Sequence, residues 1–88
     1  MYSESIVVQN KTGLHARPAA SFVQTASKFK SSITIEKDSE QANAKSMLSL
    51  LAIGASTGST VTVTAEGEDE GQAVKTLIEL VRSKFGEE

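Results

Sequence analysis

Three stretches of the chain alternate between apolar and polar residues, which is typical of strands with one buried and one solvated face. They predict strands over residues 2–8, 32–36 and 60–65. The last is the clearest, because valines alternate there with threonines. Asp38 and Ser39 follow the second stretch and predict a tight turn into a short polar strand near residues 41–43. Serine is a less natural residue than glycine in a turn that needs positive φ.

Apolar residues recur at helical spacing in three other stretches. The first stripe is made of Ala19, Phe22, Val23 and Ala26. It predicts a helix that begins at about Ala16, directly after His15, with Pro18 in its first turn. Ser46 before and Gly54 after an apolar run predict a short helix with an N-cap and a C′ residue. A third stripe predicts a C-terminal helix, acidic in its first turn and basic in its last, with Val74, Leu77, Ile78, Val81 and Phe85 on one face.

The predicted element order is β-α-β-β-α-β-α. Because each strand alternates, the sheet has one buried face, and three amphipathic helices are available to cover it. The sequence therefore predicts an α/β (α+β) open-faced sandwich, with a four-stranded, mostly antiparallel sheet covered on one face by three helices. With 88 residues and no repeat or linker, we expect a single domain over residues 1–88.

Composition excludes several classes of function. The chain has no cysteine and one histidine, which excludes a disulfide framework and a zinc site of the usual kind, so we expect no metal and no cofactor. A net charge of -2 and few aromatic residues give no reason to expect nucleic-acid binding. The longest apolar run, residues 50–53, is far too short to span a bilayer, and no secretory signal is visible. We therefore expect a cytoplasmic protein without membrane contact.

His15 stands at the predicted start of the first helix, in the stretch GLHARP over residues 13–18. A helix N-terminus exposes unpaired N–H groups and the positive end of the macrodipole, and so attracts anions. A neutral imidazole at this place is a nucleophile, and the phosphoryl group that it accepts would lie beside the unpaired N–H donors of the helix. Arg17 can offer a planar guanidinium to phosphate oxygens, and phosphoryl transfer needs mainly alignment and charge stabilisation. The alternative is a surface histidine that only caps the helix.

Residues 12–19, with the sequence TGLHARPA, resemble the active-site motif of the HPr family, the histidine-containing phosphocarriers of the bacterial sugar phosphotransferase system. The resemblance covers essentially the whole chain. It includes the segment NAKS at residues 43–46, the apolar helix after it, the loop at 54–58 and the acidic turn at 66–70. It implies an open-faced sandwich and a carrier that is not itself an enzyme.

The resemblance also implies partners and roles. His15 would accept a phosphoryl group on Nδ1 from phosphorylated enzyme I, with Arg17 assisting, and would pass it to sugar-specific IIA domains during sugar uptake. A monomer that makes transient contacts is the family expectation. Paralogues that serve a nitrogen-linked phosphorelay, or that act as regulatory or interaction modules, are alternatives. Regulatory paralogues without the histidine are disfavoured, because His15 is present.

Ser46 is a second candidate site. As an N-cap its hydroxyl would stabilise the short helix by about 1 kcal/mol relative to alanine. The resemblance to HPr of Gram-positive type implies that Ser46 is also a regulatory phosphorylation site, which brings HPr kinase/phosphorylase and a catabolite-control repressor among the candidate partners. A phosphate there would add negative charge beside a docking surface and repel an acidic partner.

The short helix after Ser46 carries more apolar residues than one buried face needs. We expect Leu50 and Ile53 to face the core, while Met47, Leu48 and Leu51 are partly exposed. An exposed apolar patch with a polar rim usually marks a docking site, and the resemblance adds Ala20 at its edge. The alternative is that all five helix residues are core. Ser49, Ala52, Leu48, Leu51, Ala42 and Ser39 depart from common family residues, which leaves open the regulatory partners that the surface fits.

Overall fold

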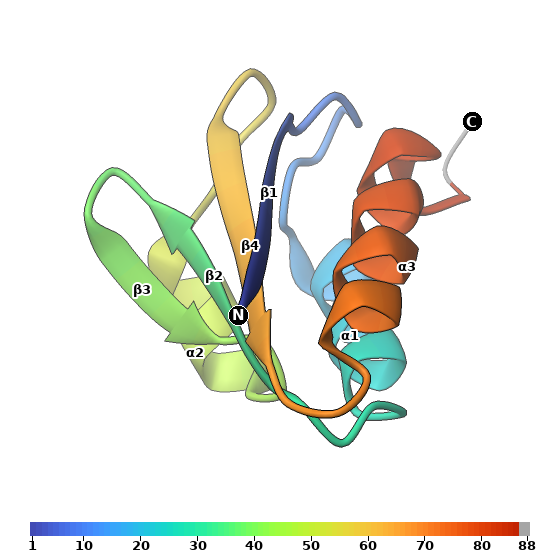
Figure 1. Ribbon diagram of the computed structural model, residues 1–88. Helices are drawn as coiled ribbons and strands as arrows, with labels where there is room; N and C mark the ends of the chain where they lie inside the picture. The colour runs from blue at the N-terminus through green and yellow to red at the C-terminus, as the bar shows by residue number, and fades with distance from the viewer. Residues whose placement is uncertain (87–88) are drawn as a thin grey trace.

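The computed structural model describes residues 1–86, so the last two residues of the expected domain lie outside the described part. Its elements follow the predicted order (Figure 1). They are β1 (Tyr2–Val7), α1 (Ala16–Ala26), β2 (Ser32–Lys37), β3 (Glu40–Asn43), α2 (Met47–Ile53), β4 (Thr60–Glu66), α3 (Glu70–Arg82) and a short 3₁₀ turn (Lys84–Gly86).

The four strands form one sheet in the order β1-β4-β2-β3, with every neighbouring pair antiparallel. The central strand β4 pairs with β1 on one side and β2 on the other, so that Ala65 lies opposite both Tyr2 and Ile33. The helices all lie on one face of the sheet and leave the other open (Figure 1). The predicted open-faced sandwich is confirmed.

The core lies between the sheet and the helices. Val61 and Val63 of β4 are fully buried against Phe22 of α1, Leu50 of α2 and Leu77 of α3, all members of one cluster. The outward residues of the sheet are mostly polar, with Val7, 41% exposed, as an apolar exception. Hydroxyls pair across strands on the open face, with Ser3 to Thr64 at 2.9 Å and Ser5 to Thr62 at 2.8 Å. The alternation in the sequence therefore marks the two faces of the sheet.

The β2–β3 connection is the two-residue turn that Asp38 and Ser39 predict. Both residues have positive φ, at 51° and 74°, which matches the right-handed twist of the flanking strands. Neither is glycine, so the turn holds two side chains in a conformation that L-residues adopt at a cost.

The expectation that Phe85 continues the face of the last helix is wrong. Helix α3 ends at Arg82, and Lys84 and Phe85 have positive φ, at 60° and 57°. The chain reverses there in a short turn, which folds the Phe85 ring back into the core, where it is 9% exposed. Hydrophobic periodicity identified a buried residue correctly but could not show the reversal that buries it.

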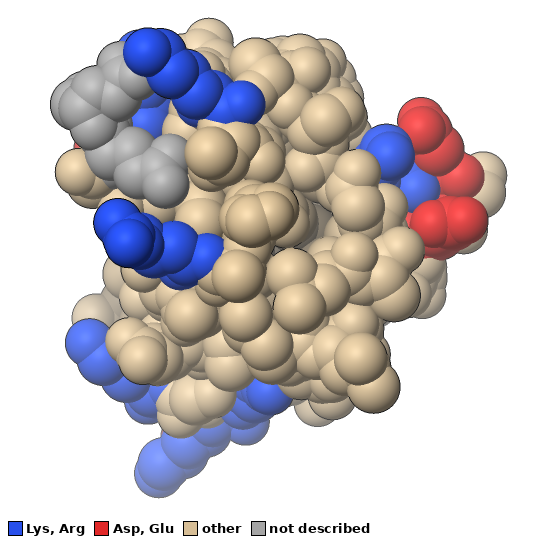
Figure 2. Space-filling model, turned by 180° about the vertical axis from the view of Figure 1, so that it is seen from behind, with Lys and Arg blue, Asp and Glu red and all other residues tan. Residues whose placement is uncertain are grey.

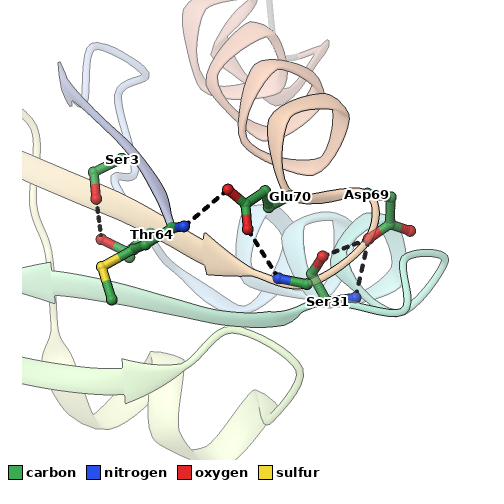
Figure 3. A network of polar contacts seen from close by, with 7 residues as sticks. Ser3, Ser31, Thr64, Asp69 and Glu70 are labelled. Atoms are coloured by element: carbon green, nitrogen blue, oxygen red, sulfur yellow. Dashed lines mark hydrogen bonds and ion pairs between the residues drawn. The ribbon is translucent and has the colours of Figure 1, made fainter.

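A polar network joins the start of α3 to the α1–β2 loop and the N-terminus (Figure 3). Asp69 accepts hydrogen bonds from the Lys30 amide at 2.9 Å and from the Ser31 amide and hydroxyl. These donors, the Ser31 hydroxyl first, lower the pKa of Asp69 to about 2. Glu70 accepts from the Gly67 amide at 3.0 Å and pairs with the Met1 amino group at 2.9 Å, which lowers its pKa. The network closes the end of the sheet at which β4 finishes.

Candidate functional site

His15 lies at the start of α1 and points into solvent. It is the N-cap residue, with extended backbone angles (φ -82°, ψ -176°), and its carbonyl accepts the first helical hydrogen bond from Ala19 at 2.9 Å. The imidazole makes no capping hydrogen bond, and the side chain is exposed. The first amides of the helix have no intrahelical acceptor. The ring is therefore accessible beside backbone donors.

Arg17 follows in the first turn of α1 and is also exposed. Among residues 1–86 no carboxylate forms an ion pair with it, so its guanidinium is available to an incoming anion. Pro18, next along the chain, is buried and lacks the N–H that a first-turn residue would leave unbonded. The exposed side chains of His15 and Arg17 are thus presented by a first helical turn that is anchored by the buried, conformationally restricted Pro18.

The loop before His15 is held by a turn and by one apolar anchor. The Gly13 amide bonds the Asn10 carbonyl at 3.2 Å, and the buried Asn10 side chain donates to the Gly13 carbonyl at 2.8 Å. Leu14 is 4% exposed, and its amide donates to the Ala55 carbonyl at 2.8 Å. The backbone on both sides of His15 is therefore fixed while the ring stays free.

Gly13 allows this loop to lie directly on the loop that follows α2. It has φ +61°, and a Cβ added to it would stand 2.6 Å from the Ala55 carbonyl oxygen and 2.7 Å from the Ser56 Cα. Only a residue without a side chain fits. The sequence showed the glycine, but the contact with residues 55–56 was missed, since nothing local signals a pairing between segments so far apart in the chain.

Ser46 caps α2 as predicted. Its hydroxyl accepts a hydrogen bond from the Ser49 amide at 3.2 Å, and Gly54 ends the helix in the left-handed region at φ 63°. The side chain of Lys45 turns away from this cap and donates to the Phe29 carbonyl at 2.7 Å. Ser46 is half-buried, and the neighbouring lysine is engaged elsewhere.

Helix α2 exposes part of its apolar surface, and it packs beside α1. Leu48 is 80% exposed and Leu51 41%, Met47 and Ala20 are half-buried, and α1 contacts α2. Leu50 and Ile53 are buried, as expected. The prediction that α2 exposes part of its apolar surface is confirmed, and we call Ala20, Met47, Leu48 and Leu51 the α1–α2 patch.

Charges are spread unevenly over the face of the molecule that Figure 2 shows. Seen from the helical side, uncharged side chains fill the middle of the face, Lys and Arg gather along one side and below, and Asp and Glu stand at the opposite edge (Figure 2). The face as a whole is therefore complementary to an acidic surface, although the net charge of the chain is -2.

Residues 1–86 contain neither a candidate metal cluster nor a helix that could span a membrane. No group of three or more His, Cys, Asp or Glu side chains is placed to hold a metal ion. None of the described helices combines the length and the apolar character needed to cross a bilayer.

Comparison with known proteins gives a consistent result. The family model described as "PTS HPr component phosphorylation site" matches residues 2–83. The HPr-like protein Crh of Halalkalibacterium halodurans is 45% identical over 84 residues, covering 96% of this chain and all of that protein. The phosphocarrier protein HPr of Neisseria meningitidis is 39% identical over 87 residues, 99% of this chain and 98% of its own length.

The crystal structure of HPr-C-His from Thermoanaerobacter tengcongensis superposes with a TM-score of 0.97 at 56% identity, covering 100% of this chain and 99% of that one. A match over nearly the full length in sequence and in structure leaves no ambiguity of family. The chain belongs to the HPr family, the phosphocarrier proteins of the phosphotransferase system.

Proposed function

We propose that His15 carries the phosphoryl group, accepting it from phosphorylated enzyme I and passing it to sugar-specific IIA domains. The observation that carries the proposal is the exposed imidazole of the N-cap residue, which makes no capping bond and whose backbone begins α1. The proposal treats residues 1–88 as one domain, a cytoplasmic carrier rather than an enzyme with its own substrate pocket.

Transfer requires an in-line exchange at phosphorus. The unprotonated Nδ1 of His15 attacks the phosphoryl group, the new P–N bond forms, and the bond to the donor breaks. No proton moves in this step when the other ring nitrogen carries the hydrogen. Arg17 and the first amides of α1 then face a group with about two negative charges, which they stabilise electrostatically. Since donor and product are of the same chemical kind, the phosphoryl group keeps its potential for onward transfer.

The α1–α2 patch would serve both partners in turn. Its exposed leucines supply apolar contact area beside the site, and the surrounding Lys and Arg favour acidic partner surfaces (Figure 2). A shared surface requires that the two partners bind alternately, which is what a carrier must do.

Intact mass spectrometry tests the central claim. The protein is mixed with enzyme I and phosphoenolpyruvate, and we expect a gain of one phosphoryl group that is lost in acid. The His15→Ala variant should gain none. A gain that survives in His15→Ala would refute the assignment. Arg17→Lys keeps the charge but loses the planar fork, and we expect slower transfer without loss of the modification.

We further propose that phosphorylation of Ser46 by an HPr kinase/phosphorylase regulates the carrier and creates the form that a catabolite-control repressor binds. Ser46 is half-buried at the edge of the α1–α2 patch, so added negative charge would repel an acidic partner. Ser46→Asp should accept phosphate from enzyme I more slowly, while Ser46→Asn, a neutral cap, should behave as wild type. Equal rates for the two variants would contradict the charge mechanism.

Two relatives point to a second candidate function. Relatives named Crh are 45% identical to this chain, which favours a regulatory role as the second candidate function. We infer a carrier because His15 is present. Comparing transfer to a sugar-type IIA domain with transfer to a nitrogen-type one separates sugar uptake from a nitrogen-linked phosphorelay.

The proposed carrier acts as a monomer, so that one accessible site meets each partner. A solved relative from T. tengcongensis is described as an HPr dimer, and a Crh structure as a swapped dimer. Light scattering over a range of concentrations decides the state of this chain, and a stable dimer would overturn the monomer proposal.

A further inference from the structure

The hydroxyl of Thr57 connects two loops that are far apart in the chain. Its Oγ1 lies 2.5 Å from the Asn10 carbonyl oxygen and 3.0 Å from the Lys11 carbonyl oxygen, 47 and 46 residues away. The single hydroxyl hydrogen is donated mainly to Asn10, with Lys11 as the second acceptor.

The contact acts on the turn from which His15 is presented. The Asn10 carbonyl that Thr57 bonds also accepts the Gly13 amide, which closes the turn. One residue later, Leu14 donates to Ala55, in the same loop as Thr57. Thr57 and Ala55 therefore hold the turn at two points, directly before His15.

The Thr57 loop is itself fixed to the sheet. The Gly58 amide donates to the Val8 carbonyl at 2.8 Å, and the Val8 amide donates to the Ser59 carbonyl at 2.8 Å. Gly54, at the end of α2, begins the loop. The Thr57 hydroxyl therefore connects the turn before His15 to a loop that is itself held by backbone hydrogen bonds to Val8.

We propose that Thr57 is a positioning residue for phosphoryl transfer: by bonding the Asn10 and Lys11 carbonyls, it holds the β1–α1 loop so that His15 is aligned with the phosphoryl group. It touches neither the reacting nitrogen nor the phosphate. This inference rests on the proposed role of His15. Alignment dominates the rate of such transfers, so small displacements of the loop reduce it.

The experiment uses three variants of the full chain. Thr57→Val keeps the shape and removes the hydroxyl, Thr57→Ser keeps the hydroxyl, and Ser56→Ala removes a neighbouring hydroxyl that makes no side-chain hydrogen bond within residues 1–86. Single-turnover transfer from phosphorylated enzyme I is measured over a range of carrier concentrations. This separates the rate inside the complex from the apparent affinity.

We expect Thr57→Val to lower the saturating transfer rate about two- to tenfold, the factor that corresponds to one neutral hydrogen bond, with unchanged apparent affinity. Thr57→Ser should restore the rate, and Ser56→Ala should match wild type. An unchanged rate in Thr57→Val, equal losses in Thr57→Val and Thr57→Ser, or a loss confined to affinity would each overturn the proposal.

Amide hydrogen exchange of the unphosphorylated protein tests the contact independently of function. The Leu14 amide should exchange faster in Thr57→Val than in wild type and Thr57→Ser, and unchanged exchange would overturn the proposal. If wild type itself gains no phosphoryl group on His15, the proposed function fails, whereas the exchange result still reports whether Thr57 holds the loop.

Discussion

The sharpest test of the site architecture is the substitution Gly13→Ala. The new Cβ would stand 2.6 Å from the Ala55 carbonyl oxygen and 2.7 Å from the Ser56 Cα, both backbone atoms that cannot rotate away. One of the two loops must move. The movement would strain the hydrogen bond from Leu14 to Ala55, now 2.8 Å.

Two effects contribute to the loss of unfolding free energy in Gly13→Ala. An alanine at φ +61° costs about 1–2 kcal/mol, partly offset because alanine restricts the unfolded chain. Forcing atoms into a filled space costs about 1–3 kcal/mol more. We expect Gly13→Ala to lower the free energy of unfolding by about 2–4 kcal/mol, which a domain of this size tolerates without unfolding.

Gly54→Ala is the matched control. Gly54 has nearly the same backbone conformation, φ +63°, but a Cβ there would meet only the Ala52 carbonyl oxygen, at 4.0 Å. This variant should show the conformational cost alone, about 1 kcal/mol. The difference between the two variants measures the close approach of the loops.

Urea unfolding gives both values, from a shift of the midpoint at constant slope. Single-turnover transfer from phosphorylated enzyme I should also be slower in Gly13→Ala, because the turn that presents His15 is displaced. If Gly13→Ala and Gly54→Ala are destabilised equally, the two loops do not touch as described, and the account of how His15 is held is wrong.

Three further predictions concern the turn, the network and the patch. Ser39→Gly should raise the unfolding free energy by about 1 kcal/mol, because φ is +74° there; a lower urea midpoint would contradict this. Because the pKa of Asp69 is lowered, its ionised form stabilises the fold above pH 3.8, and this stabilisation is lost as the pH falls toward about 2. The unfolding free energy of Asp69→Asn should therefore fall less steeply than that of wild type over this pH window. Parallel profiles of the two proteins would refute this. Leu48→Ser should change the free energy of unfolding by less than about 0.5 kcal/mol, yet weaken the affinity for enzyme I. Leu50→Ala, in the core, should lower the free energy of unfolding by about 2–5 kcal/mol. A large loss of stability in Leu48→Ser would contradict the exposure of that side chain.

The elements and most of their faces can be derived from the sequence alone. Local patterns suffice for this, because alternation and helical spacing follow from where successive side chains point. Ser46 and Gly54 predicted the ends of α2, and Asp38 and Ser39 predicted the β2–β3 turn, since caps and tight turns depend on residues next to one another. His15 was a candidate for the same reason: its place before a helix is visible in the chain.

The contacts that hold the backbone around His15 become visible only in the folded chain. The contacts of Gly13 with Ala55 and of Thr57 with Asn10 join segments more than 40 residues apart, and no periodicity encodes such a pairing. The turn that buries Phe85 is likewise not encoded by a local pattern, because the ring leaves the line of the helix to reach the core. Exposure of Leu48 and Leu51 was likewise settled by the packing of α2, because a short apolar helix has several faces that it can bury.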